Sequence, residues 1–96
     1  MYASWTEFSV KPGTREQMEQ LADDLHAAMK PMNGFVSATF LTQPESNKYA
    51  ALVVWRSREE AAAAESVAES KLQAAISGIA LGPPERARFE VYQPKP

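Results

Sequence analysis

A run of apolar residues in the middle of the chain limits the folds that it can adopt. Residues Ala50–Trp55 are all hydrophobic, and Tyr49 precedes them. Read as a strand, this run is apolar on both faces, because successive side chains point to opposite sides. One face carries Tyr49, Ala51, Val53 and Trp55, and the other carries Ala50, Leu52 and Val54. A strand of this kind is normally buried on both sides, so the fold needs a covering layer on each face.

The chain is too short to provide both layers comfortably. It has 96 residues, which is enough for one domain. A chain of this size buries only about 60–65% of the surface that it exposes when unfolded. It has no Cys and one His, which excludes disulfides and a structural zinc site. A second copy of the chain is the remaining source of stability, so we expect a homodimer.

Charge and targeting signals exclude other classes of protein. Ten Lys and Arg residues stand against twelve Asp and Glu residues, so the count predicts no basic face for nucleic acid. The run Ala50–Trp55 is too short to cross a bilayer. The first seven residues have neither the basic start nor the apolar core of a signal peptide. We therefore expect a cytoplasmic protein with neither nucleic acid nor membrane as a partner.

Turn residues divide the chain into six segments. Aromatic and β-branched residues predict strands over 3–11, 35–42 and 48–56, the last two forming a hairpin. Apolar spacing predicts a helix that follows Thr14 and ends before Pro31, and the sequence Thr14-x-x-Gln17 is typical of a capping box. A second helix is expected from a capping box at Ser57-x-x-Glu60 to about residue 77, with a break or bend near 66–70.

The last segment, residues 86–93, alternates as a strand. One face is apolar and the other carries Arg86, Arg88 and Glu90. We expect these charges to pair with Glu7 on a neighbouring strand, in a structural or interfacial role.

The element order β-α-β-β-α-β predicts an α+β fold of the ferredoxin-like type, an antiparallel sheet with both helices on one face. The helices cover only one face of the strand 48–56, and the other face would be an exposed apolar patch on a monomer. Packing of two sheets in a dimer would cover it. The alternative is that the small Ala and Val side chains of this face leave an exposed apolar surface that a monomer can tolerate.

Four short segments mark the strand ends and turns in a fixed order. They are Val10-Lys11-Pro12-Gly13, Gly34-Phe35-Val36-Ser37-Ala38-Thr39-Phe40, Leu52-Val53-Val54-Trp55-Arg56-Ser57-Arg58-Glu59-Glu60-Ala61 and Leu81-Gly82-Pro83-Pro84. Their order and spacing resemble the antibiotic biosynthesis monooxygenase domains of the dimeric α+β barrel superfamily. The resemblance spans about residues 3–93.

This resemblance implies a homodimer in which two sheets close into a barrel with the helices outside. It implies one pocket per subunit, between sheet and helices, for a planar aromatic phenol or quinol. It also implies that the substrate itself activates oxygen, with no flavin, haem or metal as cofactor. In the small cofactor-free members that the chain resembles most, the pocket uses an Asn, a Trp and a Tyr. Here the Trp is Trp55, whereas Ala51 and Ala61 stand at the Asn and Tyr positions.

Haem-degrading relatives differ at their own site. They use an Asn on the first strand and a Trp and a His on the second helical region. Thr6, Ala64 and Ala74 stand at these positions here, so haem oxygenation is not expected.

Two residues are candidates for a catalytic role. Trp55 could stack on an aromatic ligand, or it could simply anchor the sheet to the second helix as a core residue. His26 is the one side chain that ordinarily titrates near neutral pH, so it could deprotonate a phenol if it lay in the pocket. The alternative is a half-exposed surface histidine near Asp23.

Other residues are candidates for binding the ligand. The hydroxyls of Thr6, Ser37 and Thr39 could orient a carbonyl or hydroxyl group, although Thr also simply suits a strand. Tyr49 and Ala51 share the face of Trp55, and Ala61 begins an alanine run that leaves room over the sheet. Alanine is also the best helix former, so this run has a structural explanation. No metal ligand set is predicted.

Two functions fit this sequence. The first is a cofactor-independent monooxygenase that oxidises a small aromatic or quinol-type compound with O2. The second is a non-catalytic dimeric α+β barrel protein that binds a small apolar ligand or has a regulatory or structural role. The topology alone does not choose between them, because it also hosts RNA-recognition domains, acylphosphatases and metallochaperones.

Overall fold

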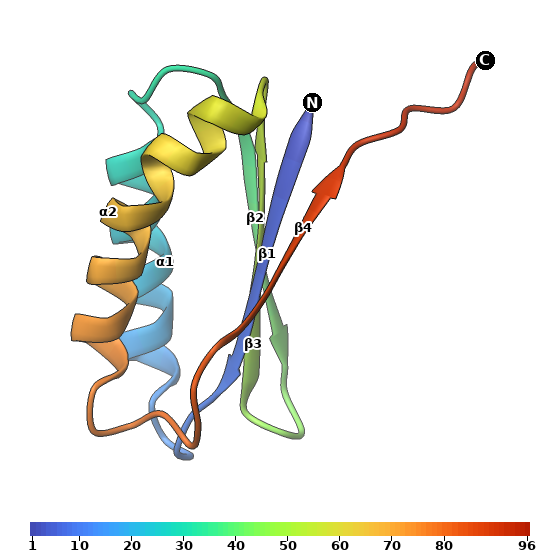
Figure 1. Ribbon diagram of the computed structural model, residues 1–96. Helices are drawn as coiled ribbons and strands as arrows, with labels where there is room; N and C mark the ends of the chain where they lie inside the picture. The colour runs from blue at the N-terminus through green and yellow to red at the C-terminus, as the bar shows by residue number, and fades with distance from the viewer.

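The chain folds as β-α-β-β-α-β, and the computed structural model describes all residues 1–96 (Figure 1). The strands are β1 (Tyr2–Ser9), β2 (Phe35–Gln43), β3 (Lys48–Trp55) and β4 (Glu85–Glu90), and the helices are α1 (Arg15–Met29) and α2 (Arg58–Ile76). All six predicted elements are present, with ends that differ from the predicted ones by a few residues.

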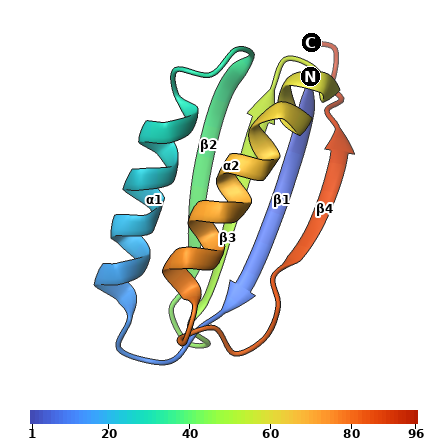
Figure 2. The ribbon, with the colours of Figure 1, turned by 60° about the vertical axis from the view of Figure 1, so that its left-hand side comes forward.

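The four strands form one antiparallel sheet in the order β2-β3-β1-β4. Both helices lie on the same face of this sheet (Figures 1 and 2). This arrangement confirms the predicted α+β, ferredoxin-like fold. No helix is long and apolar enough to cross a membrane.

Strand register assigns each side chain to a face. Trp55 and Val53 are buried on the helix side, so the alternate residues of β3 point to the open side. In the register, Thr6 lies opposite Ala51 on β3 and opposite Arg86 on β4, so all three share the helix side.

The hydrophobic core lies between the helices and the sheet. Its largest member is Trp55, of which 2% is exposed, and the ring of Phe35 meets the indole edge-on at 5.6 Å between ring centroids. Helix α1 faces the core with four buried residues at helical spacing: Met18, Leu21, Leu25 and Met29. Helix α2 contributes Ala61, Ala64, Leu72 and Ile76.

The two helices begin differently. At α2 the backbone N–H of Glu60 donates to the Ser57 hydroxyl oxygen at 3.2 Å, and this confirms the predicted N-cap. At α1 the predicted capping box is wrong. The Thr14 hydroxyl donates backwards to the carbonyl oxygen of Lys11 at 2.8 Å and makes no cap bond to the helix. The Thr14 side chain therefore bonds to the turn before the helix and not to the first backbone N–H groups of the helix.

Of the break or bend expected near 66–70, the break is absent, because α2 is helical at every residue from Arg58 to Ile76. Its first turns nevertheless run at an angle to the rest (Figure 1).

The predicted pairing of Glu7 with the arginines of the last strand is also wrong. Glu7 lies opposite Glu85 and therefore on the open side, whereas Arg86 and Arg88 point to the helix side. The two sets occupy alternate positions of antiparallel strands, and the sheet itself separates them.

Part of the open side of the sheet is apolar. Leu52 pairs with Trp5 across the central strands, and Val54 pairs with Ala3, which in turn pairs with Phe89. Phe89 is 52% exposed. No helix covers this face (Figure 1), so the surplus of apolar residues in strand 48–56 lies where the sequence predicts it.

Candidate functional site

A pocket of about 370 Å³ lies between the sheet and the two helices. Of its 30 lining residues, 21 are hydrophobic, which is typical of a site for a small, largely apolar molecule. All four strands and both helices contribute residues to its wall.

Small side chains leave this space open. Ala51 on β3 lies beneath the pocket, and Ala61, Ala64 and Ala68 of α2 lie above it. These three positions follow helical spacing, so they share one face of α2. A larger residue at any of them would occupy volume that a ligand could use.

Five of the predicted site residues line this pocket. Thr6 of β1 lies opposite Ala51 of β3 in the register, so the two residues are cross-strand neighbours on the face of the sheet that lines the pocket. The five are Thr6, Tyr49, Ala51, Trp55 and Ala61.

Trp55 belongs to both the core and the pocket wall. It is almost fully buried and its ring contacts Phe35, which fits the interpretation as a core anchor. It also lines the pocket, although only 2% of the residue is exposed.

Ser37 and Thr39 are not brought into the pocket. Thr39 lies opposite Leu52, a residue of the open face, and both hydroxyl residues are exposed. A β-bulge between Phe35 and Ser37 shifts the register of β2, and the uneven spacing is not visible in the sequence. We therefore remove Ser37 and Thr39 from the candidate site.

His26 also lies outside the pocket. It is exposed on α1, with its ring 5.9 Å from that of Phe35, centroid to centroid. This position fits the alternative of a surface histidine, so His26 is not assigned a part in the chemistry of the pocket.

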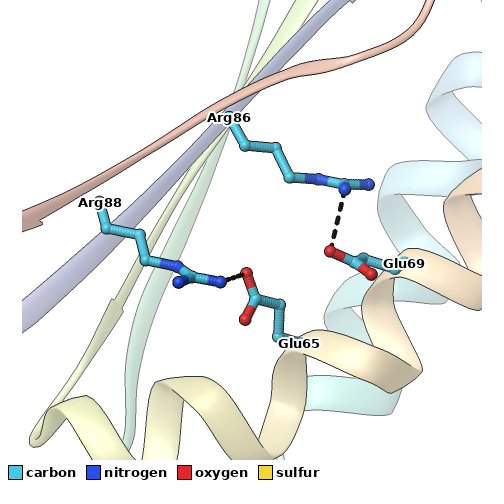
Figure 3. A network of polar contacts seen from close by, with 4 residues as sticks. All are labelled: Glu65, Glu69, Arg86 and Arg88. Atoms are coloured by element: carbon cyan, nitrogen blue, oxygen red, sulfur yellow. Dashed lines mark hydrogen bonds and ion pairs between the residues drawn. The ribbon is translucent and has the colours of Figure 1, made fainter.

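Sequence reasoning missed a charged rim. Arg86 on β4 forms an ion pair with Glu69 on α2 at 2.9 Å, and Arg88 forms a second one with Glu65 (Figure 3). All four residues line the pocket. The hydrogen bond from Arg88 to Glu65 and the charge of that carboxylate raise the pKa of Arg88. The signal in the sequence was the i, i+4 spacing of the two glutamates together with the i, i+2 spacing of the two arginines.

A second charged contact lies elsewhere on the pocket wall. The Arg58 guanidinium lies 6.0 Å from the centroid of the Tyr2 ring, at the outer limit of a cation–π contact. No three His, Asp or Glu side chains lie close enough together to hold a metal ion.

Comparison with known proteins places this geometry in context. A family model described as antibiotic biosynthesis monooxygenase matches residues 1–75. No curated protein sequence matches the chain.

Solved structures resemble the chain over nearly its whole length. A protein of Nitrosomonas europaea, named as a candidate antibiotic biosynthesis monooxygenase, has a TM-score of 0.83 at 15% identity, with 97% of this chain and 100% of that chain covered. SnoaB, a cofactor-independent oxygenase from Streptomyces nogalater, has a TM-score of 0.79 at 20% identity, covering 99% and 96%. A protein from Mycobacterium tuberculosis has a TM-score of 0.79 at 14% identity, covering 97% and 96%. At these identities the likeness shows the shared fold.

Proposed function

This chain belongs to the antibiotic biosynthesis monooxygenase family, and from that premise we propose that it oxidises a small aromatic or quinol-type compound with O2, without a bound cofactor. The observation that carries the proposal is the apolar pocket of about 370 Å³ with Trp55 in its wall. The description of SnoaB, a protein of the same fold, as a cofactor-independent oxygenase supports it.

The proposed reaction balances without an added reductant. A substrate of the anthrone type loses both hydrogens of a ring CH2 group. One atom of O2 becomes the new ring carbonyl oxygen, and the other leaves as water with those two hydrogens. The substrate supplies the electrons, and the pocket holds and orients it. Thr6 and Tyr49 can hydrogen-bond a phenolic oxygen or a ring carbonyl, because both line the pocket and each carries a hydroxyl group.

Oxygen consumption tests this proposal. We expect the protein to accelerate O2 uptake by hydroxynaphthoquinols and anthrones in buffer with a chelator and no added flavin. Ala51→Phe should abolish this acceleration, because the new ring would occupy the pocket above β3. The matched control is Ala63→Phe, since Ala63 is exposed on α2 and does not line the pocket.

The second candidate is a non-catalytic protein that binds a small apolar ligand. It is favoured by Ala51 and Ala61, which line the pocket with methyl groups at the positions where related oxygenases carry Asn and Tyr. Binding of aromatic compounds by the protein, with no O2 uptake above the buffer rate across the panel, would select this function and reject the first.

We also propose that the working unit is a homodimer joined through the open faces of two sheets. Support comes from the apolar side chains of this face, above all Leu52 and its neighbours Trp5 and Val54, which no helix of the same chain covers. Burial of such a patch by a partner sheet removes apolar surface from water.

Leu52→Arg tests the dimer. A charge at the centre of the proposed interface is costly to bury without a partner, so we expect the particle mass in light scattering to fall from twice the chain mass to that of one chain. Val67→Arg is the control, because Val67 is 39% exposed on α2 and lies away from the open face. A wild-type protein that is monomeric at high concentration would reject the proposed dimer.

A further inference from the structure

One corner of the pocket combines two arginines with two hydroxyl residues. Arg88 lies opposite Ser4 in the register of β1 and β4, and Arg86 lies opposite Thr6, so the four side chains form a two-by-two grid on the helix side. Cross-strand neighbours of this kind have Cβ atoms about 4.5–5.5 Å apart. All four residues line the pocket. The corner therefore combines two hydroxyls with two guanidinium groups.

The guanidinium groups retain most of their hydrogen-bonding capacity. Arg86 contacts Glu69 through one nitrogen, and Arg88 contacts Glu65 through one nitrogen (Figure 3). Neither arginine makes another hydrogen bond or ion pair to the protein. Each guanidinium has five N–H donors, so several remain free for an acceptor in the pocket.

Stability alone does not account for this arrangement. The side chains of the two ion pairs are between 28% and 55% exposed, and pairs with that access to water contribute little to folding. They give a largely apolar pocket a different property, because they hold two guanidinium groups with unused N–H donors at one end of it.

We propose that this corner binds the carboxylate of an aromatic acid, whose ring system lies on the apolar floor around Ala51 and Val53. The Ser4 and Thr6 hydroxyls donate to the same carboxylate, and the free N–H groups of Arg86 and Arg88 supply charge-assisted hydrogen bonds. Glu65 and Glu69 keep their ion pairs and hold the guanidinium groups in place, while the ligand uses the remaining N–H groups.

This inference rests on the proposed function for the role of the pocket. Its test measures binding and not oxidation, so either proposal can fail alone. Absence of O2 uptake with intact acid binding would reject only the enzyme, and O2 uptake without preference for acids would reject only the carboxylate corner. The arginines lie on β4, beyond the segment 1–75 that the family model matches.

The probes are 2-naphthoate and 2-naphthamide, which have nearly the same shape and differ in charge. In calorimetric titrations of the wild-type protein we expect 2-naphthoate to bind more tightly. In the double variant Arg86→Gln/Arg88→Gln, 2-naphthoate should lose about tenfold or more in affinity, because charge-assisted hydrogen bonds are lost. Binding of 2-naphthamide should change by less than about twofold.

Two further variants separate this effect from folding and from overall charge. Arg56→Gln/Lys71→Gln removes the same charge at exposed positions outside the pocket and should leave both affinities unchanged. Glu65→Gln/Glu69→Gln keeps an acceptor oxygen for each arginine but removes the competing charge, so 2-naphthoate should bind more tightly. Circular dichroism checks that each variant is folded.

Three results would overturn the proposal. One is a wild-type protein that does not bind 2-naphthoate. The second is an equal loss of affinity for the acid and the amide when both arginines are replaced. The third is weaker binding of 2-naphthoate by the Glu65→Gln/Glu69→Gln variant.

Discussion

Replacement of Trp55 by alanine is expected to lower the free energy of unfolding by about 3–5 kcal/mol. The indole is 2% exposed and packs against Phe35, so its removal leaves a cavity that the surrounding sheet and helices fill only in part. Domains of this kind have a total stability of about 5–15 kcal/mol, so the loss is a large share of the whole. Urea unfolding followed by circular dichroism measures it.

Trp55→Phe separates the two roles of this residue. The phenyl ring keeps part of the packing, so the variant should stay folded and allow ligand titrations. An unchanged affinity for 2-naphthoate would assign Trp55 to the core alone, whereas a weaker affinity would assign it a contact with the ligand. An alanine variant as stable as the wild type would contradict the position of Trp55 in the core.

Replacement of Gly34 by alanine is expected to lower the free energy of unfolding by about 2–3 kcal/mol. Gly34 has a φ of +82°, which costs a residue with a Cβ about 1–2 kcal/mol. The new Cβ would also lie 2.3 Å from the carboxyl carbon of Glu60. Glu60 must then move and give up the hydrogen bond that it accepts from the Ser57 hydroxyl at 3.0 Å, a loss of about 1 kcal/mol.

Two other glycines act as matched controls. Gly78 has a φ of +85° but open space around its Cβ position, so Gly78→Ala measures the backbone cost alone, about 1–2 kcal/mol. Gly82 has neither feature, so Gly82→Ala should be close to neutral. An equal loss for the alanine variants at 34 and 78 would show that the contact with Glu60 costs nothing.

The fold could be predicted because its determinants are local. Gly and Pro residues mark the turns, Met18 to Met29 repeat at helical spacing, and residues 48–56 read as a strand at any register. The alternation of side chains along a strand also placed Thr6 and Tyr49 on the pocket face, because the pairing of β1 with β3 contains no bulge.

What could not be predicted depends on relations between segments. The bulge after Phe35 turned Ser37 and Thr39 away from the pocket, and nothing in a single sequence marks it. The ion-pair partners of Arg86 and Arg88 could not be predicted either, because they depend on where α2 crosses the sheet. Glu7 on the neighbouring strand was a plausible but wrong choice.

The two apolar faces of β3 have a consequence for how this protein can change. The odd-numbered residues from Tyr49 to Trp55 all line the pocket, whereas Leu52 and Val54 between them lie on the open side of the sheet, where we place the partner. Substitutions that affect the proposed ligand site and substitutions that affect the proposed dimer therefore fall at different, alternating positions of one short strand. Point substitutions can alter one property and leave the other intact. A one-residue insertion in the strand would exchange the two sets, so homologues should tolerate substitutions there far better than changes in length.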